Sequence, residues 1–228
     1  VGGLFVYAWQ LYQKQARLLG ILRGATDDEG RRAALAQLSG DGSDAMSALA
    51  SAQLVAREDP KKAIELLEKI DIGKAQSVAQ DEVRAFLAQL YLFTGRIRDA
   101  RALTDQIKLE KAAVAKSRSL YAALQAEAMA RTGDAVEAKK ILETYKPEGP
   151  DVAEVAPMLY RAQVYTFFAT KNRGLAKRAL LSLAQIDPNL VAPFIQKGSS
   201  PEMQAATREV LNEVGYQTKA KTKMQRSM

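Results

Sequence analysis

The stretch LAQLYLFTGRIRDA, residues 87–100, decides the fold, because two further copies follow it without a gap. They read QAEAMARTGDAVEA at residues 125–138 and QVYTFFATKNRGLA at residues 163–176. A weaker, earlier copy retains Leu54, Glu58, Ala63, Leu67 and Ile70. The copies recur at a period of about 38 residues, or about 37 for the earliest one, within the range of about 20–50 that is typical of stacked repeats.

Each copy predicts a helix, a short polar turn and a second helix. Gly95 and Gly133 stand where the first helix has to end in the left-handed conformation that glycine adopts readily. Pro60 suits the first turn of a second helix, where its missing N–H is not needed. A small residue recurs five positions after the turn and allows two helices to approach closely: Ala63, Ala100, Ala138 and Ala176. One hairpin cannot bury its apolar face alone, so the copies are expected to stack.

The pattern predicts an all-α fold, a right-handed α-solenoid of about four antiparallel helix hairpins with a C-terminal capping helix. The expected domains are an N-terminal hydrophobic, membrane-proximal helix (1–25), a short helix and linker (26–43), the repeat domain with its cap (44–214) and a basic disordered tail (215–228). The alternative is a helical bundle without repeats, since a glycine followed by an alanine also occurs in unrelated hairpins.

Composition excludes several classes of function. The 228 residues include no histidine and no cysteine, which removes the thiol nucleophile, the imidazole base and the usual zinc ligands. The net charge of +7 is located at the two ends, because residues 1–25 and 215–228 carry seven basic side chains and no acid. A duplex-binding domain should carry its basic face on the folded part, so nucleic-acid binding is disfavoured.

The amino end suggests a membrane. It opens with the largely apolar run VGGLFVYAWQLY and then becomes basic at Lys14 and Arg17. As a helix this run would cover about 18 Å, less than the hydrocarbon core of about 30 Å. Aromatic residues followed by a cation are typical of the interfacial end of a membrane helix, and the candidates are Tyr7, Trp9, Tyr12 and Lys14. The alternative is an amphipathic first helix that packs on the body.

The repeat residues resemble the tetratricopeptide repeat (TPR) superfamily, which places a large residue four positions before a glycine and an alanine five after it. Tyr91-Gly95-Ala100 and Met129-Gly133-Ala138 match this pattern, Phe167 with Ala176 matches without the glycine, and Leu54 with Ala63 is the weakest. The usual unit has about 34 residues, so the longer period here implies roughly one extra helical turn per copy. The resemblance implies a divergent TPR-like protein over residues 44–188 that binds other proteins.

A weaker resemblance concerns the amino end. Gly2-Gly3-Leu4-Phe5, Trp9 and Tyr12-Gln13, followed by TPR-like hairpins, are similar to the membrane-anchored YfgM-like proteins, ancillary subunits of the bacterial protein translocon. This resemblance implies an extracytoplasmic body at a bacterial inner membrane. The basic residues after the apolar run instead favour a cytoplasmic body, so the side of the membrane stays open.

No catalytic, cofactor-binding or metal-binding motif stands out, and no cofactor is expected. Gly73-Lys74 lacks the upstream glycine of a phosphate-binding loop, and the acids between Asp41 and Asp44 fit a linker better than a calcium loop. The repeat register instead predicts a partner-binding groove on the first helices. Its residues are Leu49, Val55, Phe86, Gln89, Phe93, Leu124, Glu127, Arg131, Arg161, Tyr165 and Phe168, an apolar trough with charges at its rim.

The sequence therefore predicts a non-enzymatic helical-repeat scaffold that binds partner protein subunits at a membrane and assists or forms part of a membrane-associated complex. One alternative is a purely structural subunit of a large assembly with both faces covered. A weaker alternative is a nucleic-acid binder that uses the basic tail.

Overall fold

The computed structural model describes residues 28–39, 45–75, 77–112, 114–149 and 151–225. The chain forms two compact units, Val1–Arg96 and Ile97–Met228. The boundary lies within the predicted repeat domain, in the turn between two helices, and the domain bounds expected from the sequence stay a prediction. Within the described residues the secondary structure is helical, apart from one isolated bridge between Lys197 and Ser199.

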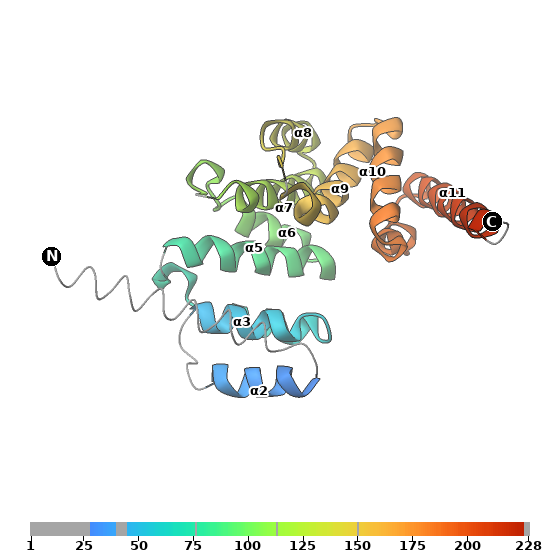
Figure 1. Cartoon of the computed structure of the whole chain (residues 1–228). Coiled ribbons are helices and arrows are strands. Elements are labelled where there is room, and N and C mark those ends of the chain that lie inside the picture. The colour runs from blue at the N-terminus through green and yellow to red at the C-terminus, as the bar shows by residue number, and fades with distance from the viewer. Residues whose placement is uncertain (1–27, 40–44, 76, 113, 150, 226–228) are drawn as a thin grey trace. The chain divides into compact units, whose positions relative to one another are not determined.

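The first unit is a stack of helices that pack in chain order. Its elements are α2 (Asp28–Ser39), α3 (Ala45–Val55), α4 (Pro60–Glu68), the short 3₁₀ helix η1 (Ile72–Lys74) and α5 (Ser77–Thr94). Helix α2 packs on α3, α3 on α4, and α5 on both α3 and α4. In Figure 1, α2, α3 and α5 lie as successive layers of this unit. The packing order is that of an α-solenoid.

The second unit continues the same scheme. Its elements are α6 (Ile97–Thr104), η2 (Leu109–Lys111), α7 (Ala115–Thr132), α8 (Ala135–Thr144), α9 (Asp151–Ala169), α10 (Arg173–Ile186), η3 (Pro188–Ile195) and α11 (Pro201–Gln225). Helix α7 packs on α6, α8 and α9, while α9 also packs on α10, which in turn contacts η3 and α11. The predicted all-α solenoid class is confirmed.

The turns between paired helices confirm the prediction that Gly95 and Gly133 end the first helices in the left-handed conformation. Gly95 and Gly133 have φ angles of 85° and 109°, and the residue after each donates its backbone N–H to the carbonyl five residues earlier. These bonds, Arg96 to Tyr91 at 2.8 Å and Asp134 to Met129 at 2.9 Å, have the spacing of a Schellman helix end. The third turn keeps this geometry without glycine, because Lys171 has a φ of 58° and Asn172 bonds to Phe167 at 2.7 Å.

Side chains and a proline begin the second helices. Asp59 accepts a hydrogen bond from the backbone N–H of Lys62 at 3.0 Å, and Pro60 occupies the first helical turn as predicted. Asn172 caps α10 in the same way by accepting from the N–H of Leu175 at 3.3 Å. Ser200 caps α11 through a 3.2 Å bond from the N–H of Met203. Each cap satisfies a backbone donor that the helix itself leaves open.

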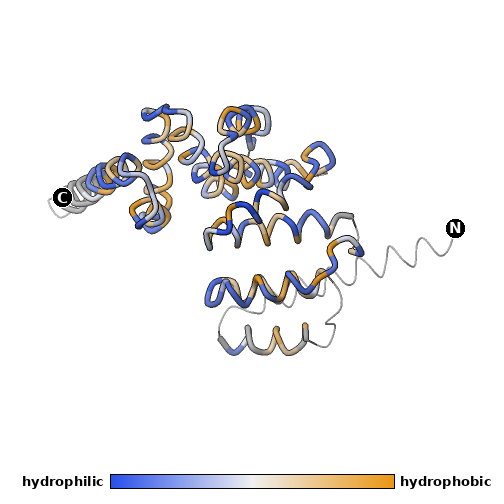
Figure 2. The backbone as a smooth tube through the Cα atoms, turned by 180° about the vertical axis from the view of Figure 1, so that it is seen from behind, coloured by the Kyte–Doolittle hydropathy of each residue, from blue (hydrophilic) through white to orange (hydrophobic). Residues whose placement is uncertain are grey.

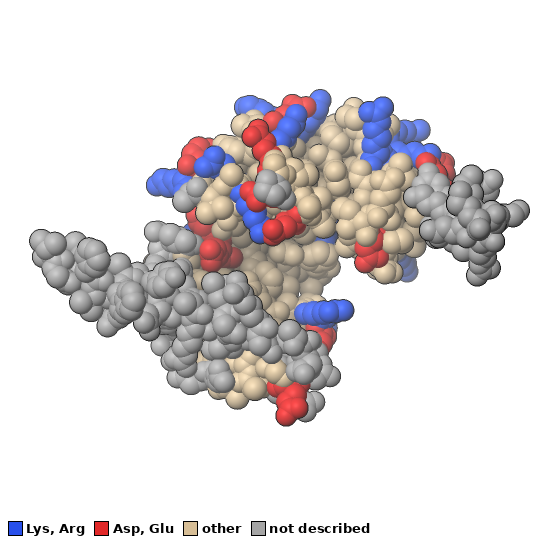
Figure 3. Space-filling view, in the orientation of Figure 1, with Lys and Arg blue, Asp and Glu red and all other residues tan. Residues whose placement is uncertain are grey.

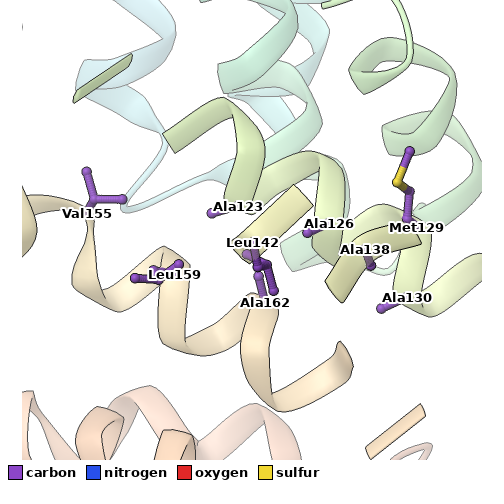
Figure 4. Packing of buried hydrophobic residues seen from close by; sticks show 9 residues of the cluster. All are labelled: Ala123, Ala126, Met129, Ala130, Ala138, Leu142, Val155, Leu159 and Ala162. Carbon is purple, nitrogen blue, oxygen red and sulfur yellow. The ribbon is translucent and has the colours of Figure 1, made fainter. Parts of the chain in front are cut away.

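The four repeat alanines are equivalent in the structure, which confirms the repeat register. Ala63, Ala100, Ala138 and Ala176 are each the fourth residue of α4, α6, α8 and α10, and each has 0% of its surface exposed. Figure 4 shows the surroundings of Ala138, which belongs to a buried cluster that α7, α8 and α9 share. The cluster comprises Ala123, Ala126, Met129, Ala130, Ala138, Leu142, Val155, Leu159 and Ala162. Figure 2 shows hydrophobic and hydrophilic residues alternating along the helices, as this one-sided burial requires.

A second buried cluster closes the C-terminal end, and we call it the C-terminal core. It joins α9, α10, η3 and α11 through Val164, Ala179, Leu180, Leu183, Ala184, Val191, Phe194, Met203 and Val210. Val214 packs against its edge. The expected capping helix is therefore present, and α11 extends to Gln225, past the predicted bound at Val214, while the predicted disorder of the tail stays a prediction. No proline follows Gly215, and lysine, alanine and glutamine favour a helix, so one glycine does not end it.

Candidate partner-binding face

One face of α5 carries the exposed part of the predicted groove, and we call it the α5 stripe. Glu82, Phe86, Gln89 and Phe93 are spaced four, three and four positions apart and so share one face of the helix. Phe86 and Gln89 are half-buried, and Phe93 is 53% exposed. Burial raises the pKa of the Glu82 carboxyl, because the charged form loses water. The α5 stripe is therefore apolar at one end and carries a poorly hydrated carboxyl at the other.

The other side of α5 holds this helix in its unit. Val83, Leu87 and Leu90 are buried, and α5 packs on α3 and α4. Each of these residues comes one position after a residue of the α5 stripe, so the two sets lie on different faces of the helix, one buried and the other partly exposed. Because this packing fixes the orientation of α5 within its unit, it also fixes which way the α5 stripe faces.

The carboxyl end of α5 is tied to α4 by a polar cluster. The Tyr91 hydroxyl donates to Glu68 Oε1 at 2.6 Å, and Arg96 Nη1 donates to the same oxygen at 2.6 Å. The Arg96 guanidinium also lies 4.1 Å from the centre of the Tyr91 ring. Tyr91 and Arg96 are also the two residues joined by the helix-ending backbone bond. Phe93 lies between them in sequence, so these contacts hold the helix end that carries it.

The charged groove positions of α7 and α9 form a buried cluster. The side chain of Glu127 is 0% exposed, and its Oε1 accepts from Arg131 Nη1 at 2.9 Å. Arg161 donates to the same oxygen through Nε at 3.2 Å and Nη2 at 2.9 Å. The Arg161 side chain is 7% exposed and that of Arg131 21%. Glu127, Arg131 and Arg161 together carry one net positive charge between the two helices.

Tyr165 lies between this charge cluster and the C-terminal core. The Arg131 guanidinium lies 4.5 Å from its ring centre, and the Phe194 ring packs against it with 5.2 Å between the ring centres. Burial raises the pKa of the Tyr165 hydroxyl; the charge of Arg131 opposes this, Glu127 adds to it and Arg161 opposes it. Tyr165 therefore contributes mainly to packing, with part of its surface open.

The structure places the predicted groove residues in different environments. Phe86, Gln89 and Phe93 share the α5 stripe, and Arg131 and Tyr165 lie together and are partly exposed. Leu124 is 0% exposed, and Leu49 and Val55 are also buried, so these three belong to the core and their assignment to the groove surface is corrected. Arg161 and Glu127 are buried in an ion cluster, and so they do not form a charged rim. Phe168 is half-buried against the C-terminal core.

The proposed membrane-interface residues Tyr7, Trp9, Tyr12 and Lys14 lie outside the described residues. Within the described residues, no helix combines the length and the apolar character needed to cross a bilayer. The same residues contain no group of three or more acidic side chains placed to hold a metal ion.

Sequence reasoning missed two polar clusters that join successive hairpins. One is Glu68 with Tyr91 and Arg96. In the other, Arg101 of α6 donates to Asp105 at 2.7 Å and to Asp134 at 2.8 Å. Arg96 and Asp134 occupy the same turn position in successive copies but carry opposite charges. Glu68 and Arg101, their partners on the preceding second helices, stand at different register positions, so the alignment of the repeats gave no signal for these pairs.

The charged surface is mixed in sign. The described residues between 28 and 170 carry 20 basic and 19 acidic side chains, and on the face drawn in Figure 3 the two signs are interspersed. Ion pairs such as Lys140–Glu137 and Lys139–Glu143 on α8 are exposed and contribute little to stability. The net charge of this part of the chain is therefore close to zero.

Paired helices of regular register, joined by left-handed turns and packed in chain order, define a helical-repeat protein. Residues 54–127, from α3 into α7, match the family described as tetratricopeptide repeat. This match and the nearly all-helical fold support a TPR-like helical-repeat protein, and domains of this family generally bind other proteins. The comparisons with curated proteins and with solved structures found no match.

Proposed function

We propose that this interaction scaffold is held at a membrane by its amino-terminal segment, docks a partner protein on the α5 stripe, and takes part in assembling a membrane-associated complex. The observation that carries the docking part is Phe93, a large aromatic residue with 53% of its surface exposed. It lies at the end of α5 that the contacts of Tyr91 and Arg96 hold in place. Exposed aromatic side chains on rigid elements are typical anchors of protein interfaces.

The chemistry of the α5 stripe indicates the kind of partner. Phe86 and Phe93 supply apolar surface, and the free energy gained on covering such surface is about 25 cal/mol per Å². Gln89 between them offers one hydrogen-bonding side chain. An amphipathic helix or an extended apolar peptide fits this composition, because its apolar residues can cover the two rings.

The membrane part of the proposal is supported by sequence alone. Tyr7, Trp9 and Tyr12 followed by Lys14 have the order of residues found at a membrane–water interface. The resemblance to membrane-anchored YfgM-like proteins points the same way and favours an extracytoplasmic body at a bacterial inner membrane.

Co-purification from detergent-solubilised membranes tests the proposal. The variant Phe93→Ser should reduce recovery of the main partner at least ten-fold while helical content is unchanged. Val136→Ser is the matched control, because Val136 is 80% exposed on α8, outside the α5 stripe. Raised salt should have little effect, since screening weakens exposed charge pairs but does not weaken apolar contacts.

Two results would contradict the docking assignment. Partner recovery that survives Phe93→Ser but disappears at high salt would locate the contact on charged surface. Equal loss with Phe93→Ser and Val136→Ser would show that the α5 stripe has no special role. Recovery of a single stoichiometric complex, with no other partners at any salt concentration, would instead favour the purely structural subunit. Phe168 is not a suitable second position, because it packs against the C-terminal core and its replacement would also affect folding.

A further inference from the structure

The last part of α11 is rich in basic residues and continues the helix beyond Val214. The buried residues Met203 and Val210 belong to the C-terminal core, and Val214 packs against it. The helix then continues to Gln225. Residues 216–225 contain Lys219, Lys221 and Lys223 and no acidic residue. A helical segment of this length extends about 15 Å.

Two of the three acids earlier on α11, the third being Glu213, form ion pairs with α10. Glu202 pairs with Arg173, and Glu209 pairs with Lys177 at 3.1 Å between Nζ and Oε2. Both partners lie on α10, so these two exposed pairs bridge α10 and α11. Residues 171–225 together carry nine basic and four acidic side chains, whereas the described residues from 28 to 170 are close to neutral. The positive charge of the described chain is therefore concentrated at this end.

We propose that the end of α11, residues 216–225, is an electrostatic contact for the surface of an anionic lipid bilayer. The inference rests on the proposed membrane location and adds a second contact to the amino-terminal one. Each lysine near the surface of an anionic bilayer contributes about 1 kcal/mol of attraction, which increases partitioning to the bilayer about five-fold. Three lysines give about a hundred-fold, which is useful because stable membrane attachment usually needs two signals.

Lipid fits this helix end better than nucleic acid does. Binding to a duplex draws its affinity from many phosphate contacts, commonly about six to ten, and this segment offers three lysines. Single-stranded binding needs several aromatic residues on which bases can stack, and residues 216–225 contain Tyr216 alone. A bilayer surface needs neither, because its charge is spread over a plane and acts within a Debye length of about 8 Å.

Vesicle flotation of the full chain tests the inference. The vesicles contain phosphatidylcholine alone, or an equal mixture of phosphatidylcholine and phosphatidylglycerol, in low and high salt. The triple variant K219Q/K221Q/K223Q should lose about a hundred-fold in partitioning to anionic vesicles at low salt, and the triple lysine-to-arginine variant should keep it. The matched control K108Q/K111Q/K146Q removes three exposed lysines elsewhere in the second unit and should lose less than five-fold.

The other outcomes are separable. Equal loss in the two glutamine variants would show a net-charge effect and overturn the proposal, as would no loss in K219Q/K221Q/K223Q. Lysine-dependent binding of a single-stranded RNA oligonucleotide, with no lysine-dependent binding to anionic vesicles, would overturn it in favour of nucleic acid. Binding to neutral vesicles reports the amino-terminal segment, so its absence would contradict the proposed membrane anchor while leaving the lysine effect at anionic vesicles to support the α11 contact.

Discussion

Arg161 of α9 directs both Nε and Nη2 to one carboxylate oxygen of Glu127 on α7, at 3.2 and 2.9 Å. Both side chains are buried, so the charges have lost most of their water and depend on each other for compensation. Arg131 reaches the same oxygen from one turn further along α7. The arrangement joins the first helices of two successive hairpins at one point.

Breaking this pair should destabilise the chain strongly. Glu127→Leu leaves Arg161 buried without its carboxylate and should lower the free energy of unfolding by about 3–5 kcal/mol. Arg161→Leu should cost less, because Arg131 still pairs with Glu127. The double variant should cost clearly less than the sum of the two single changes. Urea unfolding of all four proteins measures this coupling. Strict additivity would show that the two charges do not depend on each other.

Overpacking a repeat alanine should also destabilise. Ala138 is fully buried against residues of α7 and α9, so Ala138→Phe should cost about 1–3 kcal/mol by forcing neighbours to move. Val136→Phe on the same helix is the control, since Val136 is 80% exposed and a surface change should stay within about 0.5 kcal/mol. Thermal unfolding compares the two. Similar melting temperatures would contradict the assigned close contact at Ala138.

The repeat could be predicted from sequence because its signals are local. Gly95, Gly133 and the following alanines act through backbone conformation and side-chain size, both of which the residue type shows directly. The groove was predicted less well, because register tells which residues share a helix face but does not tell how closely the next helix covers it. Leu124 and Phe86 occupy the same register position, yet Leu124 is fully buried and Phe86 half-buried.

The charge cluster needed the structure for a similar reason. Glu127 and Arg161 belong to different copies of the repeat, and register alone placed them on a surface where charges are normally found. Only the closeness of α7 and α9 shows that they neutralise each other inside. The extension of α11 to Gln225 was not predicted either, since a lysine-rich composition is compatible with a disordered tail and with a helix.

Two turn positions allow a comparison of opposite changes. Lys171 adopts a φ of 58°, a conformation that costs a non-glycine residue about 1–2 kcal/mol, so Lys171→Gly should raise the free energy of unfolding by roughly 1 kcal/mol. Gly133→Ala should lower it by a similar amount, because a Cβ at Gly133 meets no atom within 4 Å and the cost lies in the backbone. Urea unfolding checks both. Changes of the same sign would contradict the shared left-handed turn.

The pH dependence of Glu82→Gln tests the burial of the α5 stripe. Burial raises the pKa of Glu82, so the folded chain holds this proton more tightly than the unfolded chain does. The native side chain therefore loses stability as the pH rises from the ordinary glutamate pKa of about 4.3 through the raised folded-state value. Glutamine has no such proton, so the stability of Glu82→Gln relative to the native chain should increase over that window and stay constant above it. Gln89→Asn on the same stripe removes no titrating group and should give a difference that does not vary with pH. Urea unfolding from about pH 3.5 to about pH 7.5 measures both differences, and a Glu82→Gln difference that is flat or falls with pH would show that the carboxyl keeps its water in the folded chain.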